Sequence, residues 1–237
     1  SKTLGNHSIK NLLLSALLDI KGNFNDSIPI LMKLLDVNGN ILPLTEDNAD
    51  LVGITEDNKK ILGEEQITKC ASKIKKVEYS RKIKINPQVL KAVEEADLII
   101  FSSGSLLTSI APHLINKSLV KAINNAKAPK MYICNLFTQP GETDNYAVSN
   151  HIKTLENYLG NKGIDVVIAN NNMLNKELVN IYQTTEQKDP VILDTDNLKK
   201  LGIKILADDL AKEEDGVYRH DSLKTAYLIF SYLMDNE

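Results

Sequence analysis

Residues 131–145 are MYICNLFTQPGETDN, a continuously apolar run that passes directly into a polar turn. Two other stretches share the apolar character of MYIC, namely LIIF at residues 98–101 and VVIA at residues 166–169. Strands that are covered on both faces have this unbroken pattern, because neither face meets water. Helical patterns at residues 118–126 and 149–159 separate the three runs. The alternation predicts an α/β fold with a Rossmann-like, doubly wound and mainly parallel sheet.

The sequence before Pro87 has a different pattern. A mostly buried helix is predicted at residues 8–21, with Ser8 as its cap and Gly22 at its end, and a second helix at about residues 27–35. Short strands are then predicted at residues 40–45, 50–55, 59–63 and 77–85. These strands indicate a small antiparallel insertion at about residues 40–86, inside a single α/β domain that covers residues 1–237.

After Pro87 the prediction continues with helices and strands around the three apolar runs. The further helices are predicted at residues 88–95, 176–182 and 222–234. The strands are predicted at residues 130–135, 164–169, 191–193 and 203–207, in addition to the strand that ends at Phe101.

Composition excludes several classes of protein. With 237 residues and 43% hydrophobic content, the chain can bury a sizeable core. A net charge of -3 speaks against a nucleic-acid partner, which would require a basic bias. Cys70 and Cys134 match no zinc or redox spacing, and no stretch approaches the ~20 apolar residues of a membrane span. We therefore expect a cytoplasmic protein with no membrane span, and we separately expect it to form a homo-oligomer.

Three polar loops follow the apolar runs. They are SSGSLLTS at residues 102–109, NLFTQPGETDN at residues 135–145 and NNN at residues 170–172. Each of them alone is more often a simple turn than a site. However, ligands of parallel α/β sheets bind outside the carboxyl ends of the strands, where all three loops meet. The small residues and hydroxyls of the first loop suit the close approach of an anion.

Other residues give weaker signals. The four histidines, His7, His113, His151 and His220, show no metal-ligand spacing, so we predict no metal site. The stretch RHDS at residues 219–222 is no catalytic triad by sequence alone, because a triad is a spatial arrangement. We therefore name no catalytic residue.

Four segments resemble the gluconeogenesis-factor (YvcK-like) family, which belongs to a larger group related to 2-phospho-L-lactate transferase. They are GNHSIKNLLLSAL at residues 5–17, SSGSLLTSIAPHL at residues 102–114, NLFTQPGETDNYAVSNHI at residues 135–152 and VYRHD at residues 217–221. The resemblance runs nearly from end to end. The stretch TQPGET resembles the gluconeogenesis-factor branch more than the transferase branch.

The resemblance implies a cytoplasmic bacterial protein that binds a nucleotide sugar, UDP-N-acetylglucosamine in this branch. Its implied role is in carbon metabolism and in cell-wall or cell-shape control, with no firmly assigned reaction. The transferase branch instead moves a phospholactyl group between a guanosine diphosphate carrier and a deazaflavin, with magnesium. A third alternative is a degenerate family member that binds no nucleotide.

Carried onto this chain, the resemblance implies ligand contacts from four regions. The first helix would contribute His7, Ser8 and Asn11. The phosphates would be held by Gly104, Ser105 and Ser109. The centre would be lined by Thr138, Gln139, Gly141, Glu142 and Thr143, and the nucleotide sugar would be held by Tyr182 and Arg219. Asn135 and Asn170, from the loops after two apolar runs, complete the set of expected ligand-binding residues.

The sequence departs from the family pattern at three places. Lys10 stands where the family's helix motif has a glycine, and Ser102 and Ser103 replace a Gly-Pro pair. The family also opens with a glycine-rich strand–turn–helix unit that has no counterpart in these residues. We therefore expect the sequence to be a piece of a longer protein, with a degenerate family member as the alternative.

Overall fold

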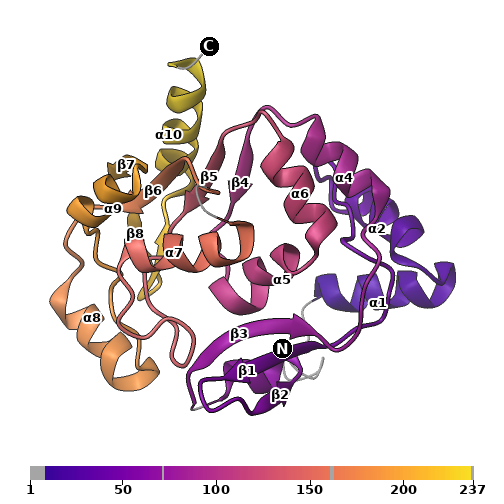
Figure 1. Cartoon of the computed structure of the whole chain (residues 1–237), viewed down its shortest axis with the longest axis horizontal. Helices are drawn as coiled ribbons and strands as arrows, with labels where there is room; N and C mark the ends of the chain where they lie inside the picture. The colour runs from indigo at the N-terminus through magenta and orange to yellow at the C-terminus, as the bar shows by residue number, and fades with distance from the viewer. Residues whose placement is uncertain (1–8, 71, 161–162, 236–237) are drawn as a thin grey trace.

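The computed structural model describes residues 9–70, 72–160 and 163–235 (Figure 1). Its central sheet has four parallel strands in the order β4 (Ile99–Phe101), β5 (Lys130–Ile133), β6 (Val166–Asn170) and β7 (Lys204–Asp208). The predicted Rossmann-like α/β class with a mainly parallel sheet is confirmed. All four strands point the same way, so their carboxyl ends share one edge of the sheet.

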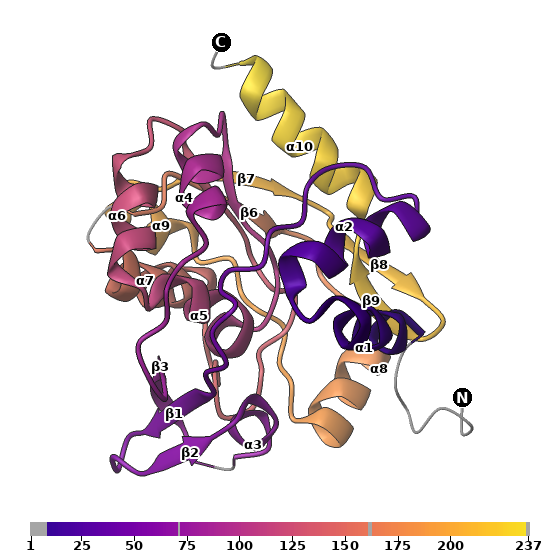
Figure 2. The same cartoon turned by 90° about the vertical axis from the view of Figure 1, so that its right-hand side faces the viewer.

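Helices cover both faces of this sheet. One face carries α6 (Lys117–Asn125), α7 (Val148–Leu159) and α9 (Thr195–Leu201), and the other carries α10 (Ser222–Met234) (Figure 2). Successive residues of a strand point to opposite faces. Tyr132 and Val167 therefore pack with the first group of helices, whereas Met131 and Val166 pack with Tyr232 of α10. Coverage on both faces explains why these strands are continuously apolar.

The antiparallel insertion is also confirmed. Its sheet has the order β2 (Lys60–Leu62), β1 (Leu51–Thr55) and β3 (Ile74–Tyr79), with the short helix α3 (Glu64–Thr68) before β3. Two hydrogen bonds tie β3 to the main body of the protein. The backbone N–H of Val77 donates to the hydroxyl of Tyr158 over 3.0 Å, and that of Ile74 donates to the carbonyl of Gly141 over 2.9 Å.

The prediction that the first helix is mostly buried is wrong. No residue of α1 (Ile9–Lys21) is buried, and Ile20 is 75% exposed, because the helix packs mainly against α2 (Phe24–Leu34). The second helix begins three residues earlier than predicted, since the Asn23 side chain accepts a hydrogen bond from the Asp26 N–H and caps it. The expected cap Ser8 lies outside the described residues.

Three strand predictions are wrong in whole or in part. Residues 40–45 and 191–193 form no strand, and the strand predicted at residues 77–85 ends at Tyr79. Their backbone groups bond to loops instead: the N–H of Asn86 donates to Leu44, and the N–H of Val191 donates to Leu136. An apolar alternation forms a strand only where a partner strand lies within reach, and this is a long-range property.

Several elements went unpredicted. The most important is the hairpin of β8 (Ala211–Glu214) and β9 (Val217–His220), whose turn residues Asp215 and Gly216 have φ of 51° and 74°. The others are the helices α3, α5 (Ala111–Leu114) and α9, and two π-helical turns, η2 (Leu106–Ile110) and η3 (Tyr182–Glu186). The remaining helices, α4 (Pro87–Glu94) and α8 (Lys176–Ile181), lie close to their predicted positions. No helix in the described ranges is long and apolar enough to cross a membrane.

Candidate functional site

Two neighbouring cavities open at the carboxyl ends of the parallel strands. The smaller one, the polar cavity, has a volume of about 230 Å³ and lies between the loops after β4 and β5 and the strand β9. Its polar lining residues are Ser103, Ser105, Asn135, Thr138, Gln139, Lys188, Tyr218 and His220. Because four separate segments of the chain supply these side chains, the tertiary structure creates a concentration of hydrogen-bonding groups there.

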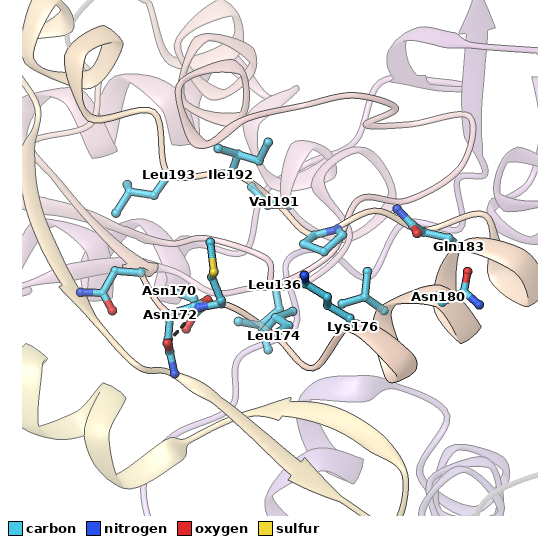
Figure 3. A pocket seen from close by; sticks show the side chains of 14 residues that line it. Leu136, Asn170, Asn172, Leu174, Lys176, Asn180, Gln183, Val191, Ile192 and Leu193 are labelled. Atoms are coloured by element: carbon cyan, nitrogen blue, oxygen red, sulfur yellow. Dashed lines mark hydrogen bonds between the residues drawn. The ribbon is translucent and has the colours of Figure 1, made fainter.

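The second, the large cavity, has a volume of about 740 Å³ and lies between α8, the loop after β6 and residues 190–193. Figure 3 shows side-chain amides at its two ends, Asn170 and Asn172 at one and Asn180 and Gln183 at the other, with apolar side chains between them. Leu136 lines both cavities. An apolar pocket with a few placed amides is typical of sites for organic ligands.

Asn135 holds the loop after β4 in place. Its Nδ2 donates to the carbonyls of Ser103 and Gly104, each over 3.0 Å, and its Oδ1 accepts from the hydroxyl of Tyr132 over 2.8 Å. Tyr132 is fully buried in the core. The end of β5 therefore positions the serine-rich loop that forms one wall of the polar cavity.

Glu142 holds the same loop from the opposite side. Its side chain is only 2% exposed, and its Oε2 accepts from the Ser105 hydroxyl over 2.6 Å and from the Leu107 N–H over 3.2 Å. Burial raises the pKa of Glu142, while the bonds from Ser105 and Leu107 act in the opposite direction. Glu142 therefore lies behind the cavity wall and supports it, without lining the cavity itself.

The rest of the TQPGET turn joins the cavity wall to the antiparallel sheet. Gly141 has a φ of 77°, and a Cβ atom added to it would lie 2.8 Å from the carbonyl oxygen of Cys70. Thr143 is buried and its hydroxyl accepts from the N–H of Gln139 over 2.8 Å. Thr138 is also buried, lines the polar cavity and accepts from the N–H of Asp189. This turn is thus mostly a structural junction, from which Thr138 and Gln139 reach the cavity.

His220 occupies the inner face of β9. Its Nε2 lies 3.0 Å from the carbonyl oxygen of Cys134, and its Nδ1 lies 3.4 Å from the hydroxyl of Ser103. A carbonyl only accepts hydrogen bonds, so Nε2 carries the proton and Nδ1 of the neutral ring is free to accept. Burial lowers the pKa of His220 and so favours the neutral ring, while the bond to the Cys134 carbonyl acts in the opposite direction.

An aromatic cluster supports β9 at this position. The rings of Phe137 and Tyr182 stack with centroids 4.3 Å apart, and Tyr218 packs beside both. The hydroxyl of the buried Tyr182 accepts from the backbone N–H of Tyr218 over 2.9 Å. Tyr182 therefore positions the strand that presents Tyr218 and His220 to the polar cavity.

The structure brings only some of the predicted site residues together. Ser105, Asn135, Thr138 and Gln139 line the polar cavity, and Asn170 lines the large one. Eight described residues line neither cavity: Asn11, Gly104, Ser109, Gly141, Glu142, Thr143, Tyr182 and Arg219. His7 and Ser8 lie outside the described residues. Arg219 is exposed and alternates with Tyr218 and His220 along β9, so it lies on the outer face of that strand.

The sequence prediction missed Ser103, Lys188, Tyr218 and His220 as cavity residues. One signal was present, because the Asp-Gly pair at residues 215–216 is a strong hairpin signal. A hairpin there places Tyr218 and His220 on one face of a strand. Nothing in the sequence pointed to Lys188. Within the described residues, no group of three His, Cys, Asp or Glu side chains is placed to hold a metal ion.

Comparison with known proteins gives consistent matches. Residues 1–211 match the family model described as 2-phospho-L-lactate transferase CofD. The gluconeogenesis factor of Bacillus subtilis is 34% identical over 98% of this chain and 73% of its own length. A relative from Thermotoga maritima is 41% identical over 94% of this chain and 71% of its own length. A crystal structure of a Bacillus halodurans protein, at 35% identity, superposes with a TM-score of 0.91 and covers 97% of this chain and 74% of that one.

Proposed function

Since the chain belongs to the 2-phospho-L-lactate transferase CofD family, in its gluconeogenesis-factor branch, we propose that it binds a nucleotide sugar of the UDP-N-acetylglucosamine type. In this proposal it is a cytoplasmic regulatory protein of carbon metabolism and of cell-wall and cell-shape control. The observation that carries the proposal is the pair of adjoining cavities at the carboxyl edge of the sheet. Rossmann-like folds bind nucleotides at this edge.

The two cavities have complementary chemistry. A diphosphate needs hydrogen-bond donors in a small volume, which suits the polar cavity with the side chains of Gln139 and Lys188. A sugar or a base needs apolar surface with a few amides, which suits the large cavity. Their common wall at Leu136 would allow one ligand to occupy both.

Backbone donors and positive charge add support. The N–H groups of Gly104 and Ser105 donate no hydrogen bond to an acceptor in the described part of the chain. Such open amides are typical of loops that bind phosphate. No described carboxylate lies within ion-pair distance of Arg219, which only adds to the effect of Lys212 in lowering the pKa of Glu214, so its guanidinium keeps donors for a phosphate that extends round the edge of β9.

A second candidate function is a phospholactate-type transfer, which the match to the transferase family model favours. That branch uses a guanosine diphosphate carrier and magnesium. The two candidates differ in nucleotide and in metal requirement. A single set of titrations therefore separates them.

The test is titration calorimetry against UDP-N-acetylglucosamine and against GDP, each with and without magnesium. We expect saturable binding of UDP-N-acetylglucosamine in both conditions. Magnesium-dependent binding of GDP alone would favour the transferase, and the absence of heat from both ligands would contradict both proposals.

A matched pair of lysine variants locates the binding site. Lys188 and Lys212 each form an ion pair with a glutamate two residues away, at 2.6 Å and 2.8 Å, but only Lys188 lines the polar cavity. Lys188→Ala should weaken binding by about 10-fold or more, the usual effect of losing one charged hydrogen bond. Lys212→Ala should leave the affinity unchanged. Equal losses of affinity in the two variants would contradict the proposal that the ligand binds in the polar cavity.

A further inference from the structure

Ser103 and His220 are 117 residues apart in the sequence and meet in the polar cavity. Nε2 of His220 carries the ring proton and donates it to the carbonyl of Cys134. Nδ1 of the neutral ring can therefore only accept, and the hydroxyl of Ser103 is the donor at that contact. We propose that Ser103 and His220 form a nucleophile–base pair with which the protein hydrolyses short-chain carboxylic esters. This activity goes beyond nucleotide-sugar binding and does not depend on it.

The geometry contains the parts of an activated serine. A base within reach of the hydroxyl is held by a third group, which here is the carbonyl of Cys134 in place of a carboxylate. The Ser103–His220 distance of 3.4 Å is long for a hydrogen bond, and such contacts shorten when a substrate binds. The imidazole is thus fixed in the tautomer that accepts the serine proton.

The position in the fold agrees with the chemistry. Hydrolases on parallel sheets carry the nucleophile in a turn between a strand and a helix, and the base follows later in the chain. By analogy, Ser103 follows β4 and precedes η2, and His220 ends β9 immediately before α10. The open N–H groups of Gly104 and Ser105 lie next to Ser103 in the chain and suit an oxyanion.

An acyl group is a better substrate for this pair than a phosphoryl group. Phosphoryl transfer proceeds through a loose transition state that gains little from a base on the nucleophile, whereas attack on a carbonyl requires one. The polar cavity, of about 230 Å³, has room for a short acyl chain. The large cavity beyond Leu136 can take the alcohol part of the ester.

The reaction balances with water as the second substrate. The Oγ atom of Ser103 bonds to the acyl carbon while its proton passes to Nδ1 of His220. The ester C–O bond then breaks, and the alcohol leaves with that proton. Water repeats the attack on the acyl-serine, again through His220, which releases the carboxylic acid and restores the hydroxyl.

The first test is labelling of the whole protein with a fluorophosphonate probe, with the adduct located by peptide mass spectrometry, and hydrolysis of p-nitrophenyl acetate. We expect an adduct on Ser103 that is absent from Ser103→Ala. Ser102→Ala is the matched control, because Ser102 is the adjacent, exposed hydroxyl, and it should label as the wild type does. Absence of labelling at Ser103, or equal labelling of Ser102, would overturn the proposal.

The second test addresses the base. His220→Gln should lower the labelling rate by at least about 100-fold, the usual contribution of a general base. If that variant fails to fold, the pH profile of the wild type decides: the rate should fall only below the ordinary titration range of histidine, and a flat profile contradicts the pair. The groups that face His220 are Ser103, Lys188 and Cys134, with Tyr218 and Asp221 beside it in the chain.

Both tests are made without nucleotide. A protein that labels at Ser103 but binds no nucleotide sugar would contradict only the proposed function. A protein that binds the nucleotide sugar but does not label would contradict only the esterase activity. The two proposals are therefore tested independently of each other.

Discussion

The Oε2 atom of Glu142 accepts a hydrogen bond of 2.6 Å from the Ser105 hydroxyl, and this bond joins the turn after β5 to the loop after β4. The same oxygen accepts from the N–H of Leu107. Ser105 extends this hydrogen-bond network to Thr108, because its hydroxyl oxygen also accepts from the N–H and the hydroxyl of Thr108. A buried carboxylate therefore sets the shape of the cavity wall from behind.

The pH dependence of stability should reveal Glu142. Burial raises its pKa above the usual 4.5, so between the usual and the raised value the folded protein holds a proton that the unfolded chain has lost. Its contribution to the free energy of unfolding is complete below the usual pKa and is lost as pH rises through the folded pKa. Glu142→Gln lacks this titration. Urea unfolding of both proteins should show the wild type losing stability relative to Glu142→Gln as pH rises.

Ser105→Ala provides a check on that interpretation. The Ser105 hydroxyl favours the charged carboxylate, so its removal should raise the folded-state pKa of Glu142 further. The loss of stability with rising pH should then extend to higher pH. A stability difference between wild type and Glu142→Gln that stays constant as the pH rises above 4.5 would contradict this account.

Gly141 and Gly202 form a matched pair for backbone strain. Their φ angles are 77° and 76°, but a Cβ atom on Gly141 would lie 2.8 Å from a backbone oxygen, whereas Gly202 has open space around it. Gly202→Ala should cost about 1–2 kcal/mol, the penalty for an L-residue in the left-handed region. Gly141→Ala should cost clearly more, because the junction with the antiparallel sheet must also shift. Equal losses of unfolding free energy would mean that the close contact relaxes without cost.

Asn135 should affect ligand binding through the loop it holds. In Asn135→Asp the carboxylate cannot donate to the carbonyls of Ser103 and Gly104, and its charge repels both oxygens. We expect the affinity for UDP-N-acetylglucosamine to fall by about 10-fold or more, as for the loss of one to two good hydrogen bonds. The control is Asn48→Asp, an exposed site with the same change of charge. Calorimetry that finds no difference between the two variants would exclude the positioning role.

Arg219 tests how far the ligand extends from the polar cavity. If a phosphate reaches round the edge of β9, Arg219→Ala should weaken binding by about 10-fold or more, since hydrogen bonds to charged groups contribute about 1.5–3 kcal/mol. Arg81→Ala, at another exposed arginine, is the control. An unchanged affinity for Arg219→Ala would confine the ligand to the inner face of β9.

Much of the fold follows from local patterns. The MYIC and VVIA runs predicted buried parallel strands, and Gly160 ends α7 as predicted, with a positive φ. The final helix has the predicted bounds, Ser222–Met234, because its cap Asp221 and its apolar pattern lie within a few residues of each other. Such features depend on neighbours in the chain, so a sequence is enough to predict them.

The sequence by itself therefore determined the class of fold, the family resemblance and the edge of the sheet where a site should lie. Only the tertiary structure decided which side chains meet there. Glu142 was expected to contact the ligand and is buried behind the wall, whereas His220 was not among the expected site residues and faces Ser103 across the cavity. The physical reason is that burial and pairing across 117 residues depend on how strands and loops pack, and no local pattern encodes that distance.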